Sequence, residues 1–251
     1  VLDHTGFAAG TSSPADFDNE PSEPYNVLPD ALLMNFRAVT LSFHPVPGGR
    51  VARVTSEPPL AGLKVDATVP LSRAACGDWR GGLKLAATDP VRWRFAGAYP
   101  AACGERYWPL AYPEPASFEN RLVGALWREL GGRLSGTVHA GVLPAGATLA
   151  FAFESPQLAQ VVRDINKFSN NTMAEQLFLT LAANASVASG ATATDVRPEQ
   201  ARAVLQQWLH ARLGAVADGV VIANGSGLAR ETRISARTLG ALLQSDWAGA
   251  A

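Results

Sequence analysis

Apolar and polar residues alternate in short runs over residues 35–154. The clearest run extends from Val39 to His44, and its two-residue period is that of a half-buried β-strand. Turn-forming residues separate further runs of the same kind. We predict strands in RVARVTS (50–56), LKVDATV (63–69), VRWRFAG (91–97), SGTVHAGV (135–142) and TLAFAFES (148–155). Residues 35–154 are therefore expected to be rich in β-structure.

The apolar period becomes helical after residue 154, and one earlier helix interrupts the β-rich region. Ser117 can cap this earlier helix, and Gly131-Gly132 ends it. A short buried strand is predicted at 219–222. The later helices are predicted from start signals and apolar stripes, and they begin at Ser155-Pro156, near Thr172, at Pro198 and at Ser235. The pattern therefore predicts an α+β fold with a β-rich middle and a helical C-terminal part.

Composition and charge indicate a folded protein and exclude several classes of partner. Of the 251 residues 47% are hydrophobic and 17% are charged, which is typical of a folded chain. A net charge of -1, from scattered basic and acidic residues, argues against a nucleic-acid partner. No apolar run reaches the roughly 18 residues of a membrane span, so no transmembrane segment is expected. The histidine spacing fits no metal site and no phosphate loop occurs, so neither a metal nor a cofactor is expected.

Cys76 and Cys103 are the only two cysteines of the sequence, and they allow two interpretations. Their spacing matches neither a metal site nor a redox motif. They are either two free buried thiols or one disulfide of an exported protein, and their loop-like surroundings favour the disulfide. Closing that loop would stabilise the fold by about 3–4 kcal/mol.

The segment KFSNNTMAEQL (167–177) brings a lysine, a serine and two asparagines together between two predicted helices. A serine hydroxyl becomes a nucleophile or a proton relay only with a proton acceptor within hydrogen-bond reach. Lys167 and Asn171 lie two residues from Ser169 on either side. Residues two apart do not face each other in a helix, so the three can converge only where a helix has ended. Spacing alone explains S-N-N equally well as a helix break followed by an N-cap.

The residues on both sides of this segment extend the interpretation. VVRDINKFSNNTMAEQLFLTL (161–181) closely resembles the second active-site block of the S13 family of penicillin-binding proteins, which are D-alanyl-D-alanine carboxypeptidase/endopeptidases. Three more segments resemble the family in the right order: VLDHTGF (1–7), YNVLPDALLMNFRAVTL (25–41) and NGSGLARETRIS (224–235). The resemblance covers most of the chain.

The resemblance implies a serine acyl-transfer enzyme that acts on peptidoglycan peptides ending in D-Ala-D-Ala and is acylated by β-lactams. Ser169 would relay a proton toward the leaving amine, and Asn171 would hold the substrate amide. Lys167 would line the site or cap the preceding helix as a cation near its C-terminus. Asn224 and Ser226 would bind substrate from a nearby loop, although turn formation explains NGSG equally well.

The resemblance also implies a domain organisation. The expected fold is a penicillin-binding, serine β-lactamase-like domain, with a mixed sheet flanked by helices and an inserted β-rich part. Residues 1–25 and 155–251 would belong to the penicillin-binding domain, and residues 26–154 to the insert. The disulfide between Cys76 and Cys103 would then serve the stability of the insert.

The sequence departs from the family at two catalytic blocks. No serine is followed three positions later by lysine, so the nucleophile block S-x-x-K is absent, and K-T-G is absent too. We expect the sequence to be an internal portion of a longer, exported and periplasmic protein. The alternative is a homologue that lacks the nucleophile and serves as a non-catalytic peptidoglycan-binding or scaffold protein.

Overall fold

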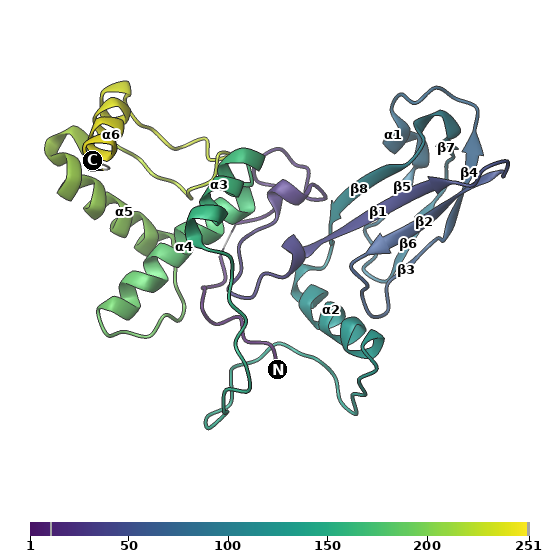
Figure 1. Ribbon diagram of the computed structural model, residues 1–251, viewed down its shortest axis with the longest axis horizontal. Helices are drawn as coiled ribbons and strands as arrows, with labels where there is room; N and C mark the ends of the chain where they lie inside the picture. The colour runs from purple at the N-terminus through teal and green to yellow at the C-terminus, as the bar shows by residue number, and fades with distance from the viewer. Residues whose placement is uncertain (11, 250–251) are drawn as a thin grey trace. The chain divides into compact units, whose positions relative to one another are not determined.

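The computed structural model describes residues 1–10 and 12–249, and the chain forms two compact units (Figure 1). Unit 1 comprises Val1–Leu2, Asn19–Val27 and Leu33–Gly141. Unit 2 comprises Asp3–Asp18, Leu28–Leu32 and Val142–Ala251. The two units interleave along the sequence, so neither matches one continuous predicted range. The assignment of 1–25, 26–154 and 155–251 to the domains of the S13 family stays a prediction.

Unit 1 contains two sheets. The five-stranded sheet has the order β7-β4-β2-β1-β8, and the three-stranded sheet has the order β3-β6-β5. The long strands are antiparallel: β1 pairs with β2 and with β8, so that Phe43 lies opposite Val54 and Val39 opposite Leu110. The strands are β1 (Ala38–Pro45), β2 (Val51–Glu57), β3 (Lys64–Val65), β4 (Thr68–Ser72), β5 (Leu85–Ala86), β6 (Arg92–Phe95), β7 (Tyr99–Pro100) and β8 (Arg106–Ala111).

The alternation read from the sequence places the core of unit 1 on one face of these strands. Leu41 and Phe43 are fully buried, and the Phe43 ring stacks on Tyr99 with the centroids 5.2 Å apart. The short helix α1 (Trp79–Leu83) adds Trp79 to this aromatic group. Helix α2 (Pro115–Glu129) buries Phe118 and Leu122 in the same core. Burial of these large side chains supplies most of the stabilisation of unit 1.

The structure confirms the disulfide between Cys76 and Cys103. The bond joins residues 27 positions apart, with the Cα atoms 4.9 Å from each other. Cys103 is buried in the core of unit 1, and Cys76 packs against that core. The alternative of two free thiols is therefore excluded.

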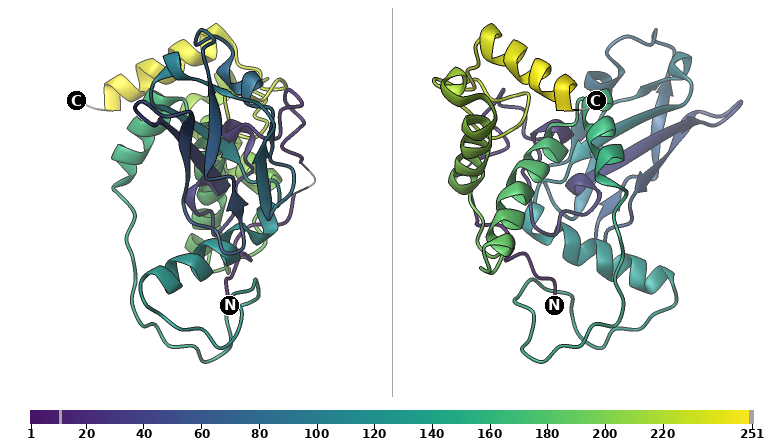
Figure 2. Two further views of the ribbon diagram at one scale, coloured as in Figure 1. Left: turned by 90° about the vertical axis from the view of Figure 1, so that its right-hand side faces the viewer. Right: turned by 60° about the vertical axis from the view of Figure 1, so that its left-hand side comes forward.

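Unit 2 is helical, and it contains α3 (Leu158–Phe168), α4 (Asn171–Ala188), α5 (Pro198–Leu213) and α6 (Ala236–Gly249). Helices α4 and α5 pack against each other (Figures 1 and 2). Phe178 and Ala182 of α4 and Ala201 of α5 form the core between them. The Ser235 hydroxyl accepts a 3.0 Å hydrogen bond from the Thr238 amide, which confirms the predicted cap of the last helix. Among the described residues no helix is long and apolar enough to cross a membrane.

Several predicted elements are wrong in place or in kind. Residues 135–142 and 148–155 form no strand, and Phe151 and Phe153 are 83% and 94% exposed. An alternating segment becomes a strand only where a neighbouring strand pairs with it along its length. Residues 135–142 form only an isolated bridge, between Ala140 and Leu2. Residues 219–222 form only an isolated bridge, between Val221 and Arg233. Helix α3 begins at Leu158 rather than at Ser155-Pro156, and α2 begins two residues before Ser117, at Pro115.

Candidate active site

The segment KFSNN forms the joint between α3 and α4. Helix α3 ends at Phe168, because Ser169 takes a left-handed backbone conformation with φ 52° and ψ 46°. Asn170 follows as the N-cap of α4, and its side-chain oxygen accepts a 2.9 Å hydrogen bond from the Met173 amide. Asn171 is the first residue of α4. The helix break and the N-cap predicted at S-N-N are confirmed.

The side chains at this joint differ in exposure. Ser169 and Lys167 are exposed, and Asn171 is half-buried. Within the described part of the chain, the Ser169 hydroxyl makes no hydrogen bond. Lys167 lies in the last turn of α3, where a cation interacts favourably with the helix dipole, and its Nζ lies 5.7 Å from the centroid of the Phe168 ring. The serine hydroxyl is therefore open to an external partner.

Asn224 and Ser226 lie on a tight loop between α5 and α6, and they bond to each other. Asn224 Oδ1 accepts hydrogen bonds from the Ser226 amide at 3.1 Å and from the Ser226 hydroxyl at 3.0 Å. Ser226 Oγ in turn accepts from the Leu228 amide at 3.3 Å. Gly225 between them has φ +78°, which favours glycine. The turn predicted from NGSG is thus formed, with Ser226 buried at 9% exposure.

This loop packs against the first turns of α4. Asn224 Nδ2 donates a hydrogen bond to Glu175 Oε1. A Cβ atom placed on Gly227 would lie 3.2 Å from Asn171 Oδ1, so the loop backbone approaches that side chain closely. The structure therefore brings Asn171, Asn224 and Ser226 into one group, together with Glu175. Ser169 and Lys167 lie at the α3–α4 joint, without a hydrogen bond to this group.

Glu175 is the residue of this group that the sequence analysis missed. Burial raises its pKa from 4.5 to about 6, and the nearby Ser226 hydroxyl opposes this rise. Its spacing of four residues from Asn171 places both on one helical face, which is the signal that the sequence did contain. Its partner Asn224 is 49 residues away, and no local pattern reveals such a pairing.

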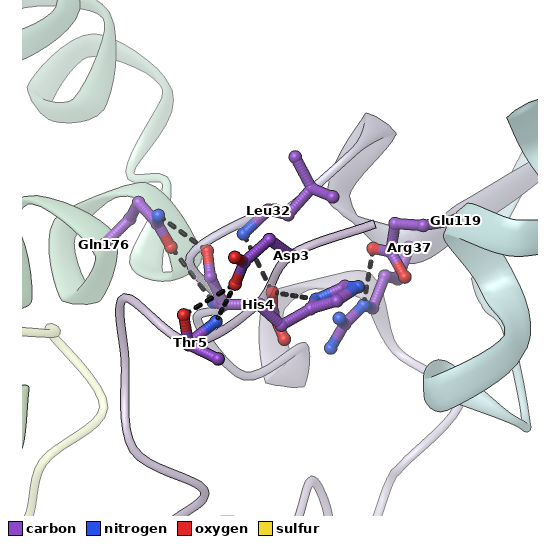
Figure 3. A network of polar contacts seen from close by, with 8 residues as sticks. Asp3, His4, Thr5, Leu32, Arg37, Glu119 and Gln176 are labelled. Carbon is purple, nitrogen blue, oxygen red and sulfur yellow. Dashed lines mark hydrogen bonds and ion pairs between the residues drawn. The ribbon is translucent and has the colours of Figure 1, made fainter. Parts of the chain in front are cut away.

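A second polar network anchors α4 within unit 2. Gln176 Nε2 donates to the Asp30 carbonyl at 2.8 Å, and Gln176 Oε1 accepts from the Asp30 amide at 3.1 Å (Figure 3). The Asp30 carboxylate contacts His4 Nδ1 at 2.6 Å and accepts from the Leu32 amide at 2.8 Å. The network thus joins three distant parts of the sequence, and its α4 member, Gln176, is the residue that follows Glu175. This network fixes the helix that carries Asn171.

A separate ion pair belongs to unit 1. Arg37 Nε donates to Glu119 Oε1 at 2.7 Å, and the Glu119 side chain is 1% exposed (Figure 3). Glu119 lies on α2, and Arg37 lies in a turn in which residues 35–37 all have positive φ. The pair joins α2 to the residue that precedes β1. Among the described residues no group of three or more metal-ligating side chains occurs in either unit.

The comparison with protein families shows which family the chain belongs to. The model of the D-Ala-D-Ala carboxypeptidase 3 (S13) family matches residues 1–248. The chain belongs to this family. The S13 match includes both the α3–α4 joint and the loop at 224–228. A search of the curated proteins found no match.

Two solved structures show the same fold. The crystal structure of penicillin binding protein 4 (dacB) from Haemophilus influenzae has a TM-score of 0.68 and 18% sequence identity, over 99% of this chain and 53% of that chain. The same protein complexed with a novel beta-lactam has a TM-score of 0.60 and 18% identity, over 98% and 51% of the two chains. The present S13 chain therefore spans about half the length of these proteins. The α+β class and its penicillin-binding fold are confirmed.

Proposed function

We propose that this S13 chain is part of an exported serine-type D-Ala-D-Ala carboxypeptidase/endopeptidase that acts through an acyl-enzyme. The observation that carries the proposal is the α3–α4 joint. An exposed serine hydroxyl, without a hydrogen bond to any described residue, lies there two residues before a half-buried asparagine that opens α4. Membership of a D-Ala-D-Ala carboxypeptidase family makes S-x-N chemistry the natural use of these two side chains.

The proposed mechanism divides proton transfer between two serines. A nucleophilic serine of an S-x-x-K block, in a longer form of the protein, attacks the carbonyl of the terminal D-Ala-D-Ala bond. The lysine of that block takes its proton, and Ser169 relays a proton to the leaving amine. Asn171 holds the substrate amide, and Lys167, Asn224 and Ser226 line the substrate side. Acylation needs both a deprotonated nucleophile and a protonated leaving group, and Ser169 serves the second need.

The proposed partners follow from this chemistry. The substrates are peptidoglycan peptides ending in D-Ala-D-Ala, and β-lactams acylate the full protein because their carbonyl occupies the same place. The complex of the Haemophilus influenzae protein with a beta-lactam supports this part of the proposal. The Cys76–Cys103 disulfide supports an exported and periplasmic location, because such bonds persist in oxidising compartments.

Covalent labelling with a fluorescent penicillin tests the proposal. The 251-residue chain and a longer gene product that carries an S-x-x-K block are each incubated with the reagent, denatured and examined for bound label. We expect label on the longer product and none on the 251-residue chain. Label on the chain itself would show that the nucleophile lies within it, and an unlabelled longer product would overturn the acyl-enzyme mechanism.

A second candidate rests on the absence of S-x-x-K and K-T-G from these 251 residues. A non-catalytic homologue would bind peptidoglycan or serve as a scaffold with the same fold. Sequencing the intact gene product separates the two. An S-x-x-K block before Val1 supports the enzyme, whereas an intact gene without that block supports the binding protein.

A further inference from the structure

The loop Asn224–Leu228 lies along one face of α4. Asn171, Glu175 and Phe178 are spaced by four and then three residues, so they share that face. At one end of the contact, a Cβ atom on Gly225 would lie 2.8 Å from Phe178 Cβ. At the other end, Gly227 approaches Asn171 Oδ1. Glu175 lies between them and bonds to the loop directly.

The Asn224 side chain connects this face to the loop. Its nitrogen donates to Glu175 Oε1, and its oxygen accepts from the amide and the hydroxyl of Ser226. An amide that is turned over would place its NH₂ group against the Ser226 N–H and its oxygen against the carboxylate, so both contacts would become repulsive. The Glu175 carboxylate and the Ser226 N–H therefore fix the orientation of Asn224 together, and Glu175 is the one of these two groups that lies outside the loop.

Further support of this loop comes from α5 and from Thr232, whose Oγ1 accepts a 3.4 Å hydrogen bond from the Ala223 amide. Arg202 Nε donates to the Ala223 carbonyl at 3.0 Å, and Arg202 also pairs with Glu199 at 3.0 Å. Arg202 and Thr232 therefore hold the residue before Asn224, while Glu175 of α4 bonds to Asn224 itself. Burial is the cause of the raised pKa of Glu175, and the nearby Ser226 hydroxyl opposes the rise.

We propose that Glu175 is a positioning residue of the candidate active site, because its carboxylate fixes Asn224 and so places Ser226 and Gly227 beside Asn171. The catalytic use of this arrangement rests on the proposed function, whereas the contact does not. Neither the hydrogen bonds within NGSG nor the S-x-N spacing assigns such a role to Glu175.

Hydrogen exchange and a pH titration on the ¹⁵N-labelled 251-residue chain test the proposal. In Glu175→Ala, we expect the amides of Ser226 and Leu228 to exchange at least about tenfold faster, because the loop loses its acceptor on α4. Glu175→Gln keeps an acceptor oxygen, so its exchange rates should stay within about twofold of the parent. The side-chain NH₂ signals of Asn224 should titrate with a midpoint near the Glu175 pKa of about 6, and not in Glu175→Gln.

Glu231→Gln is the matched control, because Glu231 is an exposed glutamate in the same connection between α5 and α6. It should change neither exchange nor titration. Unchanged exchange in Glu175→Ala, or an Asn224 signal that titrates equally in Glu175→Gln, would overturn the proposal. If Glu175→Ala does not fold, the titration of Asn224 in the parent and in Glu175→Gln decides alone. An unlabelled longer protein with these results intact would overturn the acyl-enzyme function but not the contact.

Discussion

The Glu175 carboxyl is partly buried, and it bonds to Asn224 of the candidate site. Burial raises its pKa from 4.5 to about 6. Between these pH values the native protein binds more protons than the unfolded chain, so the free energy of unfolding falls as the pH rises. At about 1.4 kcal/mol per pKa unit the loss is at most about 2 kcal/mol, and it is smaller because Glu175 is only partly buried.

The first prediction concerns Glu175→Gln, which removes this ionisation and keeps the shape of the side chain. Urea unfolding is measured from pH 4 to pH 7.5 for the parent and the variant. We expect the parent to lose stability relative to the variant between about pH 4.5 and pH 6.5, because ionisation costs stability only in the parent. Parallel stability curves across that range would contradict the assigned burial of the carboxylate.

Ser169 illustrates a different residue-scale property. Its left-handed conformation costs about 1–2 kcal/mol relative to an ordinary helical one, and it ends α3 at that point. The break also frees the hydroxyl from the helical surface, where residues two apart diverge. The backbone strain at Ser169 therefore accompanies an exposed hydroxyl, two residues before Asn171.

At the scale of elements, the contact between the loop and α4 predicts a difference between two glycines. Gly225 and Gly219 have φ +78° and +81°, but only Gly225 has a neighbour, Phe178 Cβ, within 2.8 Å of an added Cβ. Gly219→Ala should lower the free energy of unfolding by about 1 kcal/mol, because alanine is strained at positive φ. Gly225→Ala should cost about 1–3 kcal/mol more, because the loop must move away from α4. Equal unfolding free energies of the two variants in urea would contradict the close packing.

The disulfide of unit 1 gives a second prediction at this scale. Replacing both Cys76 and Cys103 by serine should lower the free energy of unfolding by about 3–4 kcal/mol, because the bond closes a loop between residues 27 apart. Urea unfolding with and without a reductant provides the control. The reductant should destabilise the parent and leave the double variant unchanged; a parent that is indifferent to reductant would contradict a stabilising bond.

Local signals predicted the α3–α4 joint well, although Ser117 and Ser155-Pro156 misplaced the starts of α2 and α3. S-N-N indicated both the end of α3 and the cap of α4, since capping depends on residues within one turn. The strand predicted at 148–155 was wrong for the opposite reason. Alternation tells which side chains share a face, but a strand also needs a partner, and the sequence does not show whether one is present.

At the scale of the whole molecule, the α+β class followed from the two periods, but the division of the chain did not. Unit 2 includes 3–18 and 28–32, which lie between segments of unit 1. These segments join unit 2 through distant backbone bonds, such as Ala8 N–H to the Val196 carbonyl at 2.9 Å. The same limit hid Glu175, because its pairing with Asn224 exists only after α4 and the loop have come together.

We expect Ser169 and Asn171 to form the S-x-N block of an S13 acyl-transfer site. The rate at which a labelled penicillin acylates the longer, S-x-x-K-containing protein measures this most directly. Loss of a proton relay slows such reactions by about 10²–10⁴. Ser169→Ala should therefore acylate at least about 100-fold more slowly. Asn171→Ala should also acylate more slowly, because it loses the contact with the substrate amide. Ser189→Ala, at the exposed end of α4, should acylate at the parent rate. Acylation of Ser169→Ala at the parent rate would show that Ser169 is not the proton relay of this site.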